Sequence, residues 1–400
     1  MQKKNQQSPI AIRYNNQKEI LKIMSNGSYS CTDLAKIMKL SNTAVENIVD
    51  ELLLMNILVR AEDQNTGRPG RRPIKFHING ELGVVASVDL ADRDLVVCIA
   101  NLNRQILYRA EVKNVIIITR ENLEAVAAEI RKGMEEPGLK GKKLFRIGIA
   151  TPGLIDKNTG YYTLAPRIED YEHLNIADFF HERFGCPVVV GNDIVSGLRG
   201  EMQFGVLGET GAKNAIFMHF DINIGLAYLF EGRIYEGNNG HAGELGFFVS
   251  DYKQPLVGLG STVSLTAVYI DIKERLAREK IAHPFAGKDV LDADEVKLLF
   301  LAGDEIVVSA FRHTAKNLAI TFLNLAYLLD IQQIVIEGKI VDFGNKFLEY
   351  VNYYIEKYNQ LKSKITVSYS ALMSRAITLG CISHAVHETL EELLLLRPEN

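Results

Sequence analysis

Apolar residues near the start of the chain recur at helical spacing in three short segments, residues 17–25, 32–38 and 42–55. We predict three helices, with Thr32 and Ser41 as the N-caps of the second and third. The side chains expected to face the core are Ile20, Leu21, Ile23, Met24, Leu34, Ala35, Ile37, Met38, Val45, Ile48, Val49, Leu52 and Leu53. Three short helices joined by tight turns are typical of a helix-turn-helix, whose last helix presents its first residues to the major groove of DNA.

Two runs of strand-like composition, residues 57–60 and 74–78, follow the third helix. The segment between them is rich in glycine, proline and arginine, and it contains Arg68, Arg71 and Arg72. A hairpin with a basic tip in this position is a wing, and extended arginines suit a narrow, strongly negative minor groove. The alternative is a solvated linker with incidental charge. Helices and hairpin in this order favour DNA binding.

The start of the predicted third helix determines how DNA would be contacted. Asn42, Thr43, Glu46 and Asn47 lie on its exposed side, without an arginine. We therefore expect base contacts from Asn42, Thr43 and Asn47, and much of the affinity from phosphate and wing contacts that weaken with salt. The charge is uneven, because residues 1–80 carry +5 and leave −9 for the rest of the chain. A basic end on an acidic body is expected of a protein that binds nucleic acid at that end.

From Gly83 onward the hydrophobic pattern changes to strands and alternating helices. Strands are predicted at residues 84–89, 95–102, 105–112, 144–150, 188–190, 331–336 and 365–369, and helices at 121–134, 304–329, 346–358 and 374–396. This alternation indicates an α/β domain.

Composition limits the class of protein. No segment holds the ~18 uninterrupted apolar residues of a membrane helix, and the polar N-terminus lacks the apolar core of a signal peptide. Cys31, Cys98, Cys186 and Cys381 lie far apart, so neither a disulfide framework nor a thiolate metal site is indicated. We expect a cytoplasmic protein without membrane association.

The stretch with the clearest chemistry is residues 236–247, EGNNGHAGELGF, which holds four glycines. Glycine adopts positive φ at little cost and lets a ligand approach the backbone closely. Asn238, Asn239, His241 and Glu244 are the side chains best suited to bind hydroxyl groups. The alternative is a structural turn that carries a surface glutamate.

This stretch resembles the sugar-contacting signature of the ROK family, which groups bacterial repressors, unassigned reading frames and sugar kinases. The likeness extends from about residue 15 to the end of the chain. It implies the two-lobed actin-like (ribonuclease H-like) sugar-kinase fold, here an α/β domain behind a winged helix-turn-helix. We expect a DNA-binding domain at 1–80 and a ROK domain at 81–400, with lobe one at about 81–200 plus the C-terminal helix and lobe two at about 201–375.

The sugar side of the family's site is represented in this chain. The turn around Gly153 resembles the family's PGxxD turn, and Asn192 and Asp193 follow a strand. In kinases of the family the residue matching Asp193 is the general base and the preceding asparagine binds a sugar hydroxyl. The resemblance thus implies that Gly153, Asn192, Asp193, His241 and Glu244 bind a sugar. The alternatives are that Asp193 caps the next helix and that His241 is only a turn residue.

The phosphate-binding turns of the family's kinases are degraded here. Residues 89–94 contain no glycine, and Asp92 and Asp94 would repel a triphosphate. The other two turns, residues 220–227 and 336–339, keep one glycine each. We expect neither ATP binding nor a catalytic residue.

The family's Cys₃His zinc site is also replaced. Phe247 stands in the position of the histidine, and Val257, Leu259 and Ser264 stand in those of the cysteines. We therefore expect a packed apolar patch, no zinc and no cofactor. Thr266 replaces a glutamate that contacts sugar in the family.

We predict a ROK-type transcriptional regulator, a repressor of carbohydrate-metabolism genes whose binding to operator DNA is modulated by a sugar or sugar derivative. A homodimer or homotetramer on a palindromic operator is the expected geometry. Two alternatives are an ATP-dependent sugar kinase with a DNA-binding head and a regulator that responds only to a protein partner. Thr266 keeps the second alternative open.

Overall fold

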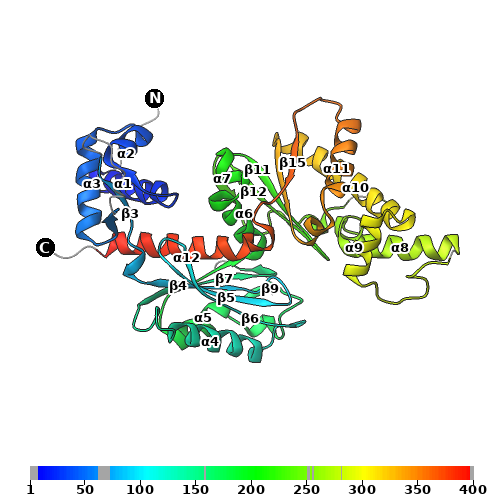
Figure 1. The fold of residues 1–400 in the computed structure, drawn as a ribbon, viewed down its shortest axis with the longest axis horizontal. Helices are drawn as coiled ribbons and strands as arrows, with labels where there is room; N and C mark the ends of the chain where they lie inside the picture. Colours follow the sequence, from blue (N-terminus) through cyan, green and yellow to red (C-terminus); the bar gives the residue numbers. More distant parts are fainter. Residues whose placement is uncertain are drawn as a thin grey trace. The chain divides into compact units, whose positions relative to one another are not determined.

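The computed structural model describes residues 8–61, 73–156, 159–249, 253–254, 256–280 and 282–396, and its ribbon is drawn in Figure 1. The chain forms two compact units. The first unit consists of Met1–Pro152, Ala165–Gly191 and Cys381–Asn400, and the second of Gly153–Leu164 and Asn192–Gly380. Each unit is therefore built from segments that are distant in the sequence.

The first unit begins with three helices and a small antiparallel sheet. The helices are α1 (Pro9–Met24), α2 (Cys31–Met38) and α3 (Asn42–Leu54), and the strands β1 (Tyr29–Ser30), β2 (Leu58–Arg60) and β3 (Lys75–Ile78) pair in the order β1–β3–β2. The predicted helices and both arms of the hairpin are confirmed. The predicted basic tip, with Arg68, Arg71 and Arg72, lies outside the described residues.

Three details of these helices differ from the prediction. Ser30, not Thr32, caps α2, because the Ser30 hydroxyl accepts from the Asp33 N–H while the Asp33 carboxylate accepts from the Ser30 N–H. Ile37 was expected to face the core but is 53% exposed. The first helix begins earlier than residue 17, because Ser8 caps it and a proline fits its first turn.

A five-stranded sheet forms the rest of the first unit. Its order is β10 (Val188–Asn192), β7 (Leu144–Thr151), β4 (Val84–Asp89), β5 (Leu95–Asn101) and β6 (Ile106–Val112). The helices α4 (Arg120–Met134) and α5 (Ile176–Phe184) cover one face, and α12 (Ala376–Leu395) covers the other (Figure 1). Gly148 of β7 permits the approach of α12, because an added Cβ would lie 3.0 Å from the carbonyl oxygen of Cys381.

The part of α12 that belongs to the first unit shares a hydrophobic core with the N-terminal helices. The buried members of this core include Ile20, Leu21, Leu34, Val45, Ile48, Leu52, Ile382, Ala385, Val386, Leu390 and Leu394. One ion pair adds to the contact, since Lys18 Nζ of α1 lies 2.5 Å from Glu391. A second ion pair joins α12 to the sheet, where Arg146 Nη2 of β7 lies 2.5 Å from Glu392. The N-terminal helices are thus packed on the C-terminal helix.

The second unit is also an α/β layer structure. Its sheet has the order β13 (Arg233–Tyr235), β12 (Ile224–Phe230), β11 (Ala215–Phe220), β14 (Gln333–Glu337) and β15 (Thr366–Tyr369). On one face lie α6 (Asp193–Phe204) and α7 (Val206–Thr210), and on the other lie α8 (Leu265–Glu279), α9 (Ala293–Ala302), α10 (Glu305–Leu329) and α11 (Asn345–Tyr358). A short hairpin, β8 (Leu154–Ile155) and β9 (Tyr162–Leu164), completes the unit.

Within the second unit, α6 crosses the first turn of α12 with the two backbones in contact. An added Cβ at Gly200 would overlap the carbonyl oxygen of Ala376, and one at Gly380 would overlap that of Ser196. Neither helix has a side chain at the crossing that can move aside. We therefore expect this contact to tolerate no larger residue.

Replacing Gly380 with alanine should lower the free energy of unfolding by roughly 3 kcal/mol, because the new methyl group forces the two helices apart. Urea denaturation of the full chain measures this loss. Gly138→Ala is the matched control, since an added Cβ there meets no atom within 4 Å. Equal stability of the two variants would contradict the close crossing.

Candidate functional site

The glycine-rich stretch at residues 236–247 folds as a loop against β12. Gly243 has a φ of +99°, and an added Cβ would overlap the carbonyl oxygen of Leu226, so only glycine permits this approach. An added Cβ at Gly258 would likewise overlap the Gly246 carbonyl, which places the segment after residue 257 against the same loop. The loop is thus held in position by backbone contacts.

Glu244 in this loop is half-buried, and its carboxylate forms no hydrogen bond or ion pair with any other residue that the structure describes. Burial raises the pKa of its carboxyl group, and the neighbouring His241 partly offsets this shift. The side chain of His241 is exposed. A half-buried carboxylate without a protein partner can accept hydrogen bonds from the hydroxyl groups of a ligand.

Asn192 and Asp193 lie at the start of α6. The Asn192 amide oxygen accepts from the backbone N–H groups of Ile194 (2.9 Å) and Val195 (3.2 Å), so Asn192, rather than Asp193, is the N-cap. The Asn192 amide donates to the carbonyl oxygen of Gly153 at 3.4 Å. Asp193 is buried, and its carboxylate accepts from the N–H of Ile194.

The start of α6 and the glycine-rich loop both contact the first residues of β12. An added Cβ at Gly225 would lie 2.6 Å from the Ile194 side chain, so the first turn of α6 rests on this strand. The glycine-rich loop contacts the next residue, Leu226. The structure therefore brings Gly153, Asn192 and Asp193 to one side of β12 and the loop with His241 and Glu244 to the same stretch of the strand. Their role in sugar binding stays a prediction.

A cluster of charged groups that the sequence analysis did not identify lies beside this strand. His219 of β11 is the register partner of Gly225 and of Glu337 on β14. Its Nδ1 lies 2.6 Å from Glu337 Oε2, and its Nε2 lies 4.0 Å from Asp221 Oδ2. Burial would lower the pKa of His219, but the charges of Glu337, Asp221 and Asp193 outweigh it and raise the pKa to about 9. His219 is therefore an imidazolium at neutral pH.

The start of α3 has the surface expected of a recognition helix. Asn42, Thr43 and Asn47 are exposed, as is Glu46. The Ser41 hydroxyl accepts from the N–H of Ala44 and fixes the first turn of the helix, as predicted. The residues proposed to contact DNA bases are therefore free to meet a partner. Base contact itself stays a prediction.

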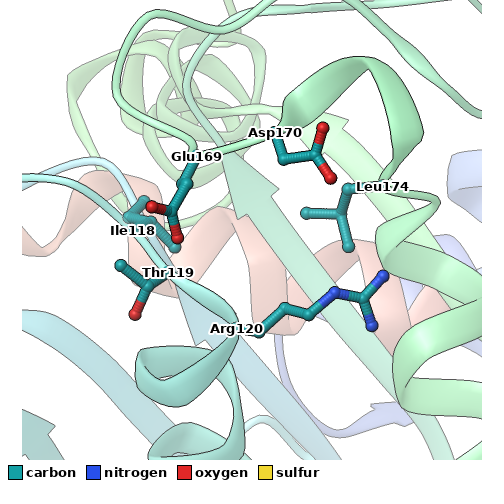
Figure 2. Close-up of a pocket in the computed structure, with 6 residues that line it drawn as sticks. All are labelled: Ile118, Thr119, Arg120, Glu169, Asp170 and Leu174. Atoms are coloured by element: carbon teal, nitrogen blue, oxygen red, sulfur yellow. The ribbon is translucent and has the colours of Figure 1, made fainter.

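A cavity of about 350 Å³ lies elsewhere, at the N-terminus of α4 in the first unit. Figure 2 shows the side chains that line it, which are Ile118, Thr119, Arg120, Glu169, Asp170 and Leu174. The Thr119 hydroxyl already accepts from the N–H of Asn122 and caps α4. None of the predicted site residues lines this cavity, so we assign no ligand to it.

A model of the ROK family matches residues 85–381. The chain belongs to the ROK family. Among its relatives, the xylose repressor of Caldicellulosiruptor bescii is 23% identical over 379 residues, which cover 92% of this chain and 94% of the repressor. The transcriptional dual regulator NagC of Escherichia coli is 24% identical over 321 residues, which cover 79% of this chain and 78% of NagC.

Solved structures of ROK proteins share the fold. A ROK family transcriptional regulator described as a homolog of the E. coli MLC protein superposes with a TM-score of 0.78 at 19% identity, over 96% of this chain and 98% of that one. A ROK glucokinase from Streptomyces griseus, in complex with glucose and AMPPNP, has a TM-score of 0.64 at 22% identity and covers 76% of this chain and 99% of the kinase. The predicted fold class, a ROK sugar-kinase fold behind an N-terminal DNA-binding domain, is confirmed.

In this ROK chain, Arg167 closes the loop that replaces the first phosphate turn. Its guanidinium donates to the backbone carbonyl oxygens of Leu90, Ala91, Asp92, Val115 and Ile116. The Asp92 carboxylate accepts from the N–H of Arg93, and that of Asp94 accepts from the N–H of Asn114. The polar groups of this loop are thus engaged within the protein. Arg167 was not predicted as a functional residue, because its partners lie far from it along the chain.

The glycine kept in the third phosphate turn has a packing role. Gly338 has a φ of +102°, and an added Cβ would lie 2.5 Å from the carbonyl oxygen of Phe220. Its presence therefore does not require a nucleotide.

The segment that replaces the ROK zinc site is only partly apolar core. Leu259 and Ser264 are buried, and Ser264 caps α8. Phe247 is 66% exposed and Val257 is 39% exposed, so the prediction of a packed patch is wrong for these two. No cluster of three or more His, Cys, Asp and Glu within the described ranges is arranged to hold a metal ion. The Thr266 hydroxyl donates to the carbonyl oxygen of Ile222.

Two further properties concern the whole described chain. Its helices include none that is long and apolar enough to span a membrane. Its four cysteines are free, and burial raises the pKa of Cys98 and of Cys186 to about 11. These buried thiols are therefore protonated at neutral pH.

His219 should make the stability of the protein depend on pH. Its pKa is about 9 in the fold and 6.5 in an ordinary environment, so its contribution is complete below pH 6.5 and is lost as the pH rises through 9. Urea denaturation from pH 6 to pH 10 should show wild type more stable than His219→Gln at pH 6, by at most roughly 3 kcal/mol, with a shrinking difference above pH 8. Glu337→Gln should show the same loss of pH dependence. If the difference in the free energy of unfolding between wild type and His219→Gln did not change with pH, the ion pair between His219 and Glu337 would be contradicted.

Proposed function

We propose that this ROK protein is a DNA-binding repressor of carbohydrate-metabolism genes whose operator affinity is changed by a sugar or sugar derivative. The observation that carries the proposal is the helix-turn-helix on α1–α3, with its exposed polar third helix, attached to a ROK domain. Relatives that match over more than 90% of both chains are named xylose repressors, which supports the same role here. NagC, a further relative, is also a transcriptional regulator.

Each part of the proposed site has a role that follows from its chemistry. Asn42, Thr43 and Asn47 would contact base edges, because amide and hydroxyl groups can both donate and accept there. Arg68, Arg71 and Arg72 of the wing would contact the minor groove and phosphates. Residues 1–80 would form the DNA-binding domain and residues 81–400 the sensor, in the cytoplasm, where operator DNA is found. A homodimer or homotetramer would read a palindromic operator.

The effector would bind beside β12. Glu244 has no protein partner within the described chain and can accept hydrogen bonds from hydroxyl groups, with His241 beside it as a donor. Asn192 and Asp193 would contact further hydroxyls from the start of α6, next to the backbone of Gly153. Carboxylates and amides arranged in this way suit a polyhydroxylated ligand.

The chain is a regulator and not a sugar kinase, although ROK glucokinases share its fold. The loop in place of the first phosphate turn presents carbonyl oxygens to Arg167, and the turn after β11 carries Asp221. A kinase instead needs glycine-rich turns whose N–H groups meet the phosphates. Its xylose-repressor relatives are regulators over nearly the full length of the chain.

DNA binding should weaken when the proposed recognition helix is truncated. We expect Asn47→Ala to reduce affinity for DNA from the protein's own upstream region by about tenfold, which is within the usual cost of a lost base contact. Fluorescence anisotropy at several salt concentrations measures the affinity for this DNA, which should fall steeply as the salt concentration rises. Asn352→Ala, an exposed asparagine on α11, is the control. If both variants bind like wild type, Asn47 is not a contact residue.

The sugar response should depend on the site beside β12. In the same assay, a sugar that changes operator affinity at least tenfold in wild type should have no effect in Asp193→Ala or Glu244→Ala, while both variants still bind DNA. A variant that loses the sugar response but still binds DNA would show that sugar sensing and DNA binding use different residues. A normal response in both variants would exclude the proposed site. DNA binding that no sugar changes in wild type would favour a protein partner as the signal.

A further inference from the structure

One acidic side chain lies among the residues of α3 that we propose to contact bases. Glu46 follows Asn42 by four residues and Thr43 by three, and side chains at these spacings are neighbours on the surface of a helix. Asn47 is the next residue along the chain. All four side chains are exposed, while the apolar side of α3 is buried. A DNA groove that receives the three proposed contact residues therefore receives Glu46 as well.

The carboxylate of Glu46 has no hydrogen bond or ion pair with any residue that the structure describes. Other acids of these helices do have structural partners. Asp33 completes the capping box of α2. The Glu51 carboxylate, on the same helix as Glu46, accepts from the side chains of Arg13 and Gln17 of α1. Glu46 makes no such contact between helices, so its carboxylate is available to a partner outside the protein.

A second free acid, Asp50, lies one turn further along α3. Burial raises the pKa of the Cys31 thiol at the start of α2, and the charges of Glu46 and Asp50 raise it further, so both carboxylates lie on the side of α3 that faces α2. Asp50 is exposed and also has no hydrogen bond or ion pair within the described part of the chain. It carries the same charge as Glu46 but lies further from the N-terminal end of the helix, which is the end that meets bases.

A carboxylate distinguishes the four bases at their edges in the major groove. An ionised carboxylate accepts hydrogen bonds and donates none. Guanine and thymine present only acceptors to it there, whereas cytosine presents the donor group N4. Adenine presents an acceptor beside its amino group, a pair that suits the amide of asparagine or glutamine. Cytosine is therefore the base whose own edge offers a carboxylate a donor and no acceptor.

We propose that Glu46 is a specificity-determining residue, which accepts a hydrogen bond from the N4 amino group of a cytosine in the operator. Opposite guanine or thymine the same carboxylate would meet acceptor atoms and lose its hydrogen bonds to water, so these bases are selected against. Glu46 thus adds discrimination to a surface whose other proposed contacts are neutral amide and hydroxyl groups. The inference rests on the proposed function, because it concerns the DNA that the same helix would bind.

Selection of bound sequences from a random DNA library, followed by sequencing, measures the base preference of the full chain at every position of its site. Wild type should select cytosine at a fixed position. Glu46→Gln keeps the length of the side chain but replaces an acceptor oxygen with an amino group. The preference for cytosine at that position should fall at least about fivefold and shift toward adenine, with the other positions unchanged.

Asp50→Asn is the matched control, because it removes an equal charge from the same side of α3. Each variant removes one negative charge that lies near the DNA phosphates, so both should bind DNA of random sequence at least as tightly as wild type does. Fluorescence anisotropy measures this affinity. We expect the change in base preference in Glu46→Gln alone.

Four results would overturn the inference, and they have different meanings. A cytosine preference that Glu46→Gln keeps shows that Glu46 does not read this base. A preference that both variants lose equally shows that the charge of α3, rather than a contact from Glu46, is its cause. If Glu46→Gln instead changes a position where wild type selects another base, the assignment to cytosine is wrong. In these three cases the repressor stands. If wild type selects no sequence at all, specific DNA binding itself fails, and the inference fails with it.

Discussion

The backbone contact between α6 and the first turn of α12 constrains the rest of the structure. Gly200 and Gly380 leave no side chain at this crossing, so the two helices cannot shift there without a clash of main-chain atoms. The start of α6 carries Asn192 and Asp193, which we propose to bind the effector. The remainder of α12 lies in the core of the first unit, where Ile382 and Leu390 pack with the N-terminal helices. One helix therefore takes part in the packing of both units.

Two charged side chains near the positions of the family's phosphate turns have partners within this ROK chain. Arg167 binds carbonyl oxygens of the first loop, and His219 binds Glu337 at the ends of β11 and β14. In a kinase the corresponding turns would need free N–H groups and room for a metal-bound triphosphate. Here Arg167 and His219 are engaged by the protein itself. The loss of glycines from these turns and the acids at Asp92, Asp94 and Asp221 both disfavour a bound triphosphate.

The sequence predicted the N-terminal helices and many of the later elements, because their signals are local, but α5, β11, β12, α8 and α9 were not predicted. Helix periodicity and the cap at Ser41 placed α3, and glycine spacing identified the loop around Gly243. Prediction from the sequence failed where the contacts of a side chain depend on residues that are distant along the chain. His219 was not identified, because only the sheet order β12–β11–β14 brings Glu337 to it. Phe247, which replaces a zinc-binding histidine of the family, was expected to be buried. An apolar residue in that position is buried only if other side chains pack around it, and the Phe247 ring is 66% exposed.

Retention of Asp193 without the kinase turns has a physical explanation in this environment. A general base must accept a proton from a hydroxyl while a phosphoryl group arrives beside it. A carboxylate among other carboxylates can still accept the hydroxyl's hydrogen bond, but the same neighbours oppose the phosphoryl group. Binding and catalysis therefore make opposite demands on the charges around Asp193. We therefore propose that Asp193 accepts a hydrogen bond from a hydroxyl of the effector, a role that requires no incoming phosphoryl group.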